Sequence, residues 1–281
     1  MRFRSFAAPA LLALLLAAPG RAQTAQADAA PAAEPTGLRL ELNIPAQRLL
    51  LFDGDSVIRR YTVSVGQPGH DTPDGSYTIQ RAEWNPWWRP PEGRAWAKDD
   101  KVTPPGPDNP MGRVKLFFAP YYYLHGTPHE KELGTPASHG CVRMRNTDVI
   151  ELATILHRRA SPTMPASAIP AVLRNYSNTR WVDFRNQVPL TIRYQPVVVE
   201  GGNFKVYPDI YHRYAVNTEM VYQALMAAGY DPTGVPRATV RSLLTRAAAA
   251  KGTFIVPVHD AFGDLPAAPA RAATAQTAVD R

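Results

Sequence analysis

The sequence predicts a mainly β fold: a β-sandwich type of domain with short helices, followed by an α/β extension at the C-terminus. Short apolar segments recur from residue 38 onward, and several alternate every two residues, as a half-buried strand does. Turns rich in Gly, Pro, Asp and Asn separate these segments at a spacing typical of an all-β sandwich or barrel. Longer patterns with helical spacing come only after residue 145.

The first predicted strands cover residues 38–42, 47–52, 57–65 and 76–80. Asp53-Gly54-Asp55 is a hairpin turn signal between the second and third of them. Thr72-Pro73-Asp74-Gly75 is a proline–glycine turn before the fourth. In the third strand the residues expected to face inward are Val57, Tyr61, Val63 and Val65.

Residues 84–112 break this pattern and hold four of the five tryptophans. Without periodicity, the stretch predicts a long ordered loop packed by its own rings. Such a loop either covers a sheet face or forms a lid over a site, and the two roles are compatible.

Two strands are predicted next, over residues 114–119 and 121–125, which places His125 at a strand end, where side chains are well fixed. Asn146-Thr147-Asp148 predicts the cap of a helix that runs to about His157. Its apolar stripe consists of Val149, Ile150, Leu152, Ile155 and Leu156.

The remaining chain predicts a proline-rich connection, a short helix, three strands, two longer helices and a last strand. The connection covers residues 161–170 and the short helix 171–181. The three strands cover 188–194, 197–200 and 204–207, the two longer helices 216–228 and 237–250, and the last strand 254–258. We expect a main domain at 37–160, an extension at 161–262 and a disordered tail at 263–281.

Residues 1–22 read as a secretory signal, with Arg2 and Arg4 before an apolar run and small residues near Ala22. Cleavage after Ala27 and an uncleaved anchor are the alternatives. We expect a disordered linker at 23–36 and no transmembrane segment after cleavage. Cleavage removes three arginines and no acid, so the formal net charge falls from +7 to +4. No basic stripe interleaved with aromatic residues indicates nucleic-acid binding.

Residues 125–144, HGTPHEKELGTPASHGCVRM, hold the only cysteine, Cys141, together with His125 and His139. A nearby imidazole can take the thiol proton and make the sulfur a nucleophile. A lone cysteine is more often buried and inert. The polar, glycine-flanked setting of Cys141 argues against that interpretation here, and a free thiol in an oxidising compartment is a liability unless it is buried or used.

The residues alone do not decide which histidine is the base. Gly140 suggests a tight turn in which the N–H groups of Gly140 and Cys141 point at one spot and form an oxyanion hole. His125, His139 and Cys141 are also residue types that ligate zinc. Because no paired-cysteine or HExxH pattern is present, we expect no metal.

SHGCVRM with HGT upstream resembles the signature of the L,D-transpeptidase catalytic domain family (YkuD-like). Residues 38–66, the TPDG turn, NPWWRPP and PPGPDNPMG are similar to further segments of that family, in the same order. The resemblance covers about residues 37–157. Residues 186–212 loosely resemble the sequence after the catalytic loop in larger members.

The resemblance implies that Cys141 is the nucleophile and His125 its base. It places His139 in the site, with the backbone of His139, Gly140 and Cys141 stabilising the oxyanion, while Ser138 orients the loop. The side chains expected at the substrate are Arg143, Trp87 and Tyr123, and a loop-bracing role for Arg143 is the alternative. Some members have serine after the first histidine. Here that position is Gly126, so a backbone carbonyl would have to orient the imidazole.

The resemblance further implies a periplasmic enzyme without a cofactor that acts on peptidoglycan stem peptides. It would transfer an acyl group from a tetrapeptide stem to an amine, release D-alanine and form 3→3 cross-links. L,D-carboxypeptidase, exchange with a free D-amino acid, cross-link hydrolysis and anchoring of an envelope protein use the same site. A non-catalytic wall-binding protein and a structural zinc protein are interpretations from other classes.

Overall fold

The computed structural model describes residues 36–213 and 216–268. The expected signal peptide at 1–22, most of the expected linker, and residues 269–281 of the expected tail lie outside the described residues. Thr36, the last residue of that expected linker, is buried, and its hydroxyl accepts a hydrogen bond from Leu38 N at 3.1 Å.

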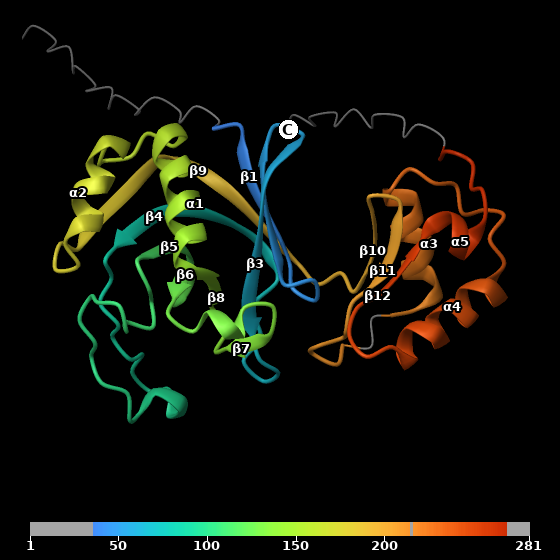
Figure 1. Cartoon of the computed structure of the whole chain (residues 1–281), viewed down its shortest axis with the longest axis horizontal. Coiled ribbons are helices and arrows are strands. Elements are labelled where there is room, and N and C mark those ends of the chain that lie inside the picture. Colours follow the sequence, from blue (N-terminus) through green and yellow to red (C-terminus); the bar gives the residue numbers. More distant parts are fainter. Residues whose placement is uncertain (1–35, 214–215, 269–281) are drawn as a thin grey trace, which may run out of the picture. The chain divides into compact units, whose positions relative to one another are not determined.

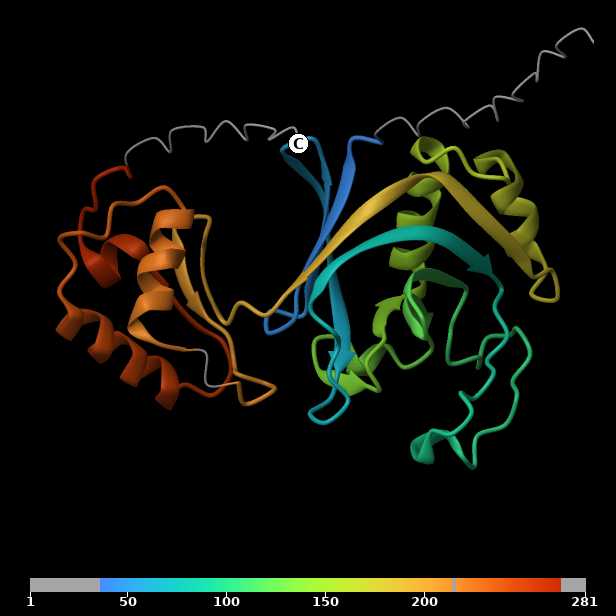
Figure 2. The same cartoon turned by 180° about the vertical axis from the view of Figure 1, so that it is seen from behind.

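Nine strands form one sheet in the order β2-β1-β9-β4-β5-β6-β8-β3-β7, and an additional β2–β3 pairing closes eight of them into a ring. The mainly β prediction is therefore confirmed, with the layers joined into one continuous sheet (Figures 1 and 2). The strands are β1 (Leu38–Asn43), β2 (Arg48–Asp53), β3 (Ser56–Gly66), β4 (Gly75–Trp84), β5 (Val114–Ala119), β6 (Tyr122–Thr127), β7 (Pro136–Ser138), β8 (Val142–Arg145) and β9 (Arg180–Arg193).

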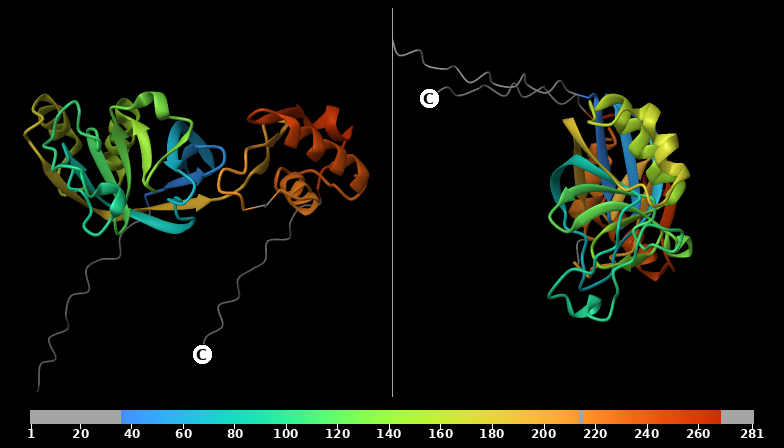
Figure 3. Two further views of the ribbon diagram at one scale, coloured as in Figure 1. Left: turned by 90° about the horizontal axis from the view of Figure 1, so that it is seen from below. Right: turned by 90° about the vertical axis from the view of Figure 1, so that its left-hand side faces the viewer.

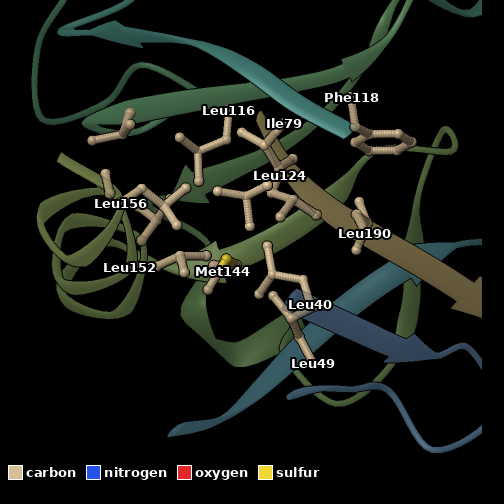
Figure 4. Packing of buried hydrophobic residues seen from close by; sticks show 14 of the residues in the cluster. Leu40, Leu49, Ile79, Leu116, Phe118, Leu124, Met144, Leu152, Leu156 and Leu190 are labelled. Carbon is tan, nitrogen blue, oxygen red and sulfur yellow. The ribbon is translucent and has the colours of Figure 1, made fainter. Parts of the chain in front are cut away.

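One face of the strands packs into a single apolar core. Helix α1 (Asn146–Arg159) adds Leu152 and Leu156 to this core, next to Leu124 of β6 and Met144 of β8 (Figure 4). Of the four residues expected to face inward on β3, Tyr61, Val63 and Val65 are buried and Val57 is half-buried. The register shift between β2 and β3 at Leu51/Phe52 explains this difference, because a bulge interrupts the alternation of faces.

The expected domain boundary at residue 160 is wrong. Strand β9 lies in the middle of the sheet, parallel to β1 and antiparallel to β4 (Figures 2 and 3). The predicted helix at 171–181 is also partly wrong, since α2 spans only Ile169–Arg174 and β9 begins at Arg180. Alternate burial of Val182 and Phe184 marks this strand.

The loop after β4 is ordered by contacts within itself. Trp88 pairs with Thr103 in an isolated bridge, and Trp88 stacks on Trp96, which lies in the short helix η1 (Ala95–Ala97). The buried Asn109 side chain donates to the carbonyls of Pro86, Thr103 and Pro104. Short 3-10 turns also occur at η2 (Glu130–Glu132) and η3 (Ala166–Ala168).

Asn146 does not cap α1 as predicted. Its Oδ1 accepts from Arg113 N at 2.9 Å, and its Nδ2 donates to Thr127 O at 3.1 Å. The side chain is thus used to tie the start of β5 to the end of β6, and the helix begins without a side-chain cap. This linkage fixes the strand end that carries His125.

Residues 196–268 contain a second apolar cluster, centred on Phe204. This cluster lies between a three-stranded sheet and three helices. The strands are β10 (Val197–Glu200), β11 (Asn203–Val206) and β12 (Phe254–Pro257), and the helices are α3 (Thr218–Ala227), α4 (Arg237–Ala249) and α5 (Val258–Phe262). All of these except α5 lie close to the predicted positions.

The expected disordered tail begins too early, because Asp231 N donates to Pro266 O at 2.8 Å and Leu265 packs against the second cluster. Among the described residues, no helix has the length and apolar character needed to cross a membrane.

Candidate active site

A row of polar residues runs across four neighbouring strands of the main sheet. Glu83 pairs with Lys115, Lys115 with His125, and His125 with Arg143. Directly paired residues present their side chains on the same face of a sheet. The adjacent row is apolar and buried in the core: Ala82, Leu116, Leu124 and Val142. The two-residue period of the strands therefore separates the core face from the face that carries the candidate site.

This polar face lines a cavity of about 1350 Å³. Seven of the nine residues predicted from the sequence line it: Cys141, His125, His139, Ser138, Arg143, Trp87 and Tyr123. The other two, Gly126 and Gly140, contribute backbone groups next to it. The cavity therefore gathers the predicted side chains from three strands, the turn before β8 and the tryptophan-rich loop.

His125 is buried, and its Nδ1 lies 2.7 Å from the carbonyl oxygen of Gly126. A carbonyl only accepts, so Nδ1 carries the proton and donates it, which leaves Nε2 as the ring's acceptor. Burial lowers the pKa of His125 to about 3, with further lowering by the charge of Arg143. The imidazole is therefore neutral near pH 7 and able to take a proton at Nε2.

The Cys141 thiol is also uncharged. The residue is half-buried, and its Sγ lies 3.4 Å from the carbonyl oxygen of Tyr121. Burial raises the thiol pKa to about 11. The resting pair is thus a thiol and a neutral imidazole, and a base is needed to convert this thiol to a thiolate.

The turn before Cys141 is held by Ser138. The Ser138 hydroxyl donates to Cys141 O at 2.5 Å and accepts from Gly140 N at 3.1 Å. Gly140 has φ +109°, and a Cβ on it would lie 2.8 Å from the ring of Tyr122, so only glycine fits this turn.

The expectation that both Gly140 and Cys141 N–H groups point into an oxyanion hole needs correction. Because Ser138 occupies the Gly140 N–H, that group is not free to bind an oxyanion. The Cys141 N–H has no hydrogen-bond acceptor among the residues that the structure describes.

His139 lies between two other rings. Trp96 stacks on it with centroids 4.0 Å apart, and His70 meets it edge-on at 4.7 Å. Burial and the neighbouring His70 lower its pKa. His139 is therefore the residue of this turn on which the tryptophan-rich loop packs.

Gly126 leaves no room for a serine. A Cβ at this position would lie 2.2 Å from Oδ1 of Asn146. Asn146 fills the same space next to Gly112, where a Cβ would lie 2.3 Å from the same oxygen. The imidazole is consequently oriented by a backbone carbonyl.

Two ion pairs flank His125. Arg143 pairs with Glu132, which braces the loop before β7, and Lys115 Nζ lies 2.6 Å from Glu83 Oε2. Lys115, Glu83 and Trp96 also line the cavity, and none of them was predicted as a site residue. The signal for Lys115 was its place as the single charged residue in the apolar strand VKLFFA.

In the described part of the chain, no three His, Cys, Asp or Glu side chains converge where they could hold a metal ion. His125, His139 and Cys141 are not gathered into such a group.

A family-wide sequence profile described as the L,D-transpeptidase catalytic domain (YkuD) matches residues 38–190. The chain belongs to this family. The L,D-transpeptidase match includes most of β9, in agreement with the sheet. Its end at residue 190 leaves β10 to β12 and α3 to α5 outside the family domain.

Several bacterial L,D-transpeptidases are similar in sequence. The probable L,D-transpeptidase ErfK/SrfK of Salmonella typhimurium is 33% identical over 116 residues, which are 38% of this chain and 38% of that protein. The probable L,D-transpeptidase YbiS of Escherichia coli is 36% identical over 116 residues, with the same coverage of both chains. The match thus spans well under half the length of these relatives.

Solved structures of the family are more distant. An L,D-transpeptidase from Mycobacterium smegmatis matches with a TM-score of 0.37 and 14% identity, and the match covers 56% of this chain and 58% of that chain. An Enterococcus faecium L,D-transpeptidase has a TM-score of 0.38 and 12% identity, covering 56% and 50%.

Proposed function

We propose that this chain is a peptidoglycan L,D-transpeptidase in which Cys141 is the nucleophile and His125 the general base. The observation that carries the proposal is a neutral His125, with Nδ1 bound to Gly126 O, that shares one cavity with the Cys141 thiol. Family membership supports the reaction class.

In the first half-reaction, Nε2 of His125 takes the thiol proton while Sγ attacks the carbonyl carbon at the L-centre of the third stem residue. The Cys141 N–H stabilises the oxyanion that forms. The bond to the terminal D-alanine then breaks, the imidazolium gives its proton to the departing amine, and a thioester remains.

In the second half-reaction, an amine of another stem attacks the thioester carbonyl and gives a proton to His125. The new amide bond forms the 3→3 cross-link, and the sulfur leaves and regains its proton. The loop over residues 85–113 covers the cavity through Trp96 and disfavours water as the acceptor.

Arg143 is the side chain we propose for a substrate carboxylate. It lines the cavity next to His125, and its pairing with Glu132 holds the guanidinium in place. Trp87 and Tyr123 provide apolar walls for the stem peptide. The amino-terminal signal predicted from the sequence agrees with export and a periplasmic location, where this substrate lies.

The test is mass spectrometry of defined tetrapeptide muropeptides incubated with the wild-type chain and with Cys141→Ala and His125→Asn variants. We expect cross-linked dimers and free D-alanine from the wild type, and neither product from Cys141→Ala. Cross-linking by Cys141→Ala would overturn the proposal.

The product masses also distinguish the other acceptors. Tripeptides alone indicate L,D-carboxypeptidase activity, exchanged termini indicate a D-amino acid acceptor, monomers from dimers indicate a hydrolase, and stems attached to lysine indicate protein anchoring. A wild-type chain that forms no product and no covalent carbapenem adduct at Cys141 would be a wall-binding protein without catalysis.

A further inference from the structure

A segment beyond the family domain contacts the loop between β3 and β4, and that loop contacts the turn before Cys141. Residues 207–213 follow β11, and within them Ile210 and Tyr211 pack against the core of the main sheet. The Tyr211 hydroxyl donates to Gly66 O at 2.9 Å and accepts from Thr72 N at 3.0 Å. It therefore bridges the two ends of the loop between β3 and β4.

Thr72 links this loop to the candidate site. Its side chain is fully buried, with 0% exposure. The hydroxyl accepts from Gly66 N at 2.8 Å and donates to Gly140 O at 3.0 Å. Tyr211 holds the Thr72 backbone, and Thr72 in turn holds the carbonyl of the residue before Cys141.

The held carbonyl fixes the direction of one particular N–H. A trans peptide is planar, and its C=O and N–H point in opposite directions. Gly140 O and Cys141 N belong to the same peptide unit, so a hydrogen bond that holds the carbonyl on one side aims the Cys141 N–H to the other. That N–H is bonded to none of the described residues.

We propose that Tyr211 is a positioning residue that acts through Thr72 to aim the Cys141 N–H at the oxyanion. This inference rests on the proposed function and extends it to a part of the chain outside residues 38–190. Tyr211 is not among the residues that line the cavity. Its effect is on how well one backbone donor is held during acylation.

Further contacts hold Tyr211 where it is. Its backbone N donates to the Tyr194 hydroxyl at 2.9 Å, and the two rings stack with centroids 5.4 Å apart. Arg213 then pairs with Asp74 at 3.0 Å and with Asp71 at 3.5 Å. The segment is thus held by Tyr194 at Tyr211 itself, and by Arg213 to the loop that contains Thr72.

The experiment compares two reactions of Cys141 in the full chain. Acylation by a carbapenem passes through an oxyanion, whereas alkylation by iodoacetamide does not, so only the first needs the aimed N–H. Rates of both are measured by intact-mass spectrometry for Tyr211→Phe, which keeps the ring and removes the hydroxyl. The matched control is Tyr222→Phe, whose hydroxyl donates to Val235 O at 3.0 Å.

We expect Tyr211→Phe to lower the carbapenem acylation rate about tenfold at saturation, less than the loss of an oxyanion donor itself. Alkylation should stay within about twofold of the wild type, as should both reactions of Tyr222→Phe. A Thr72→Ser variant should keep the acylation rate, because it retains the hydroxyl, and Thr72→Val should lose it. This second pair carries the test if Tyr211→Phe does not fold.

Acylation by Tyr211→Phe or Thr72→Val at the wild-type rate would overturn the inference and leave the proposed function standing. A parallel fall of acylation and alkylation would also overturn it, since it would indicate a general loss of structure. A wild-type chain that is alkylated but never acylated would instead overturn the proposed function, and the inference with it.

Discussion

The indole of Trp96 lies parallel to the imidazole of His139, with the ring centroids 4.0 Å apart and the planes 6° apart. Trp96 belongs to the loop between β4 and β5, and His139 lies in the turn that leads to Cys141. Stacked aromatic pairs contribute about 0.5–1.5 kcal/mol beyond the area they bury. We expect this contact to help hold the loop over the cavity and to be weak enough to break when a substrate enters.

Replacing Trp96 by Ala should therefore open the cavity to water. We expect the ratio of hydrolysed tripeptide to cross-linked dimer to rise by up to about fivefold, because loss of about 1 kcal/mol changes the ratio of closed to open loop by that factor. The ratio is measured by mass spectrometry of muropeptide products, with Trp96→Phe as the control that keeps a stacked ring. An unchanged ratio in Trp96→Ala would show that this loop does not exclude water.

The pH dependence of Cys141 alkylation should reflect its raised pKa. Burial moves the thiol pKa to about 11, so the thiolate fraction at pH 8 is small and grows with each pH unit up to that value. We expect the iodoacetamide rate of the free protein to rise continuously from pH 7 to pH 10, without a plateau above pH 9. A plateau near pH 7 would contradict this and would indicate a preformed thiolate–imidazolium pair.

The lowered pKa of His125 should make the folded state less stable in acid. The unfolded imidazole binds a proton below about pH 6.5, whereas the folded one stays neutral down to about pH 3. Between these values the unfolded state binds more protons, so the free energy of unfolding falls as the pH falls.

The measurement is urea unfolding of the wild type and of His125→Asn at pH 7 and pH 4. The wild type should lose up to about 3 kcal/mol more than the variant over this interval, since each unit of pKa difference corresponds to about 1.4 kcal/mol. Comparing the two proteins cancels the other titrating groups. Equal losses would mean that His125 is protonated in the folded state.

Gly126 and Asn146 should behave as a coupled pair. Gly126→Ser places a Cβ only 2.2 Å from Asn146 Oδ1. We expect overpacking of this kind to lower the free energy of unfolding by about 1–3 kcal/mol. Asn146→Ala removes the obstacle together with two hydrogen bonds.

Adding Gly126→Ser should consequently cost less stability in the Asn146→Ala background than in the wild type, because only Arg113 N, at 3.2 Å, still crowds the new Cβ. A double-mutant cycle in urea detects this as non-additivity. Additive losses would show that the serine meets no obstacle at Asn146. Gly106→Ser is a suitable control, because Gly106 does not have a positive φ and a Cβ there meets only the backbone oxygen of Pro104, at 4.0 Å.

The strands and most of the site were predictable because their signals are local. The alternation of Leu124 and His125 follows from the two-residue period of a strand. Gly126, with no hydroxyl of its own, led us to expect a backbone carbonyl as the partner of His125, and Gly126 O takes that position. The tight turn at Gly140 followed from glycine's freedom at positive φ.

The features that the sequence did not predict depend on register and on long-range pairing. Lys115 and Glu83 meet only because β4 and β5 pair in one particular register. Asn146 carries the usual signal of a helix cap, and tertiary contacts with Arg113 and Thr127 override it. The contact of Tyr211 with Thr72 joins residues 139 positions apart, a separation at which no periodicity in the sequence gives a signal.

The central place of β9 has a consequence for the order of folding. Until residues 180–193 are present, β1 and β4 each keep an open edge, because β9 is the strand that joins them. Open edges pair readily with other chains, and contacts this distant in sequence form slowly. A chain that ends near residue 160 would hold all nine site residues predicted from the sequence and should still aggregate, so the site becomes usable only after the last strand of the ring has been added.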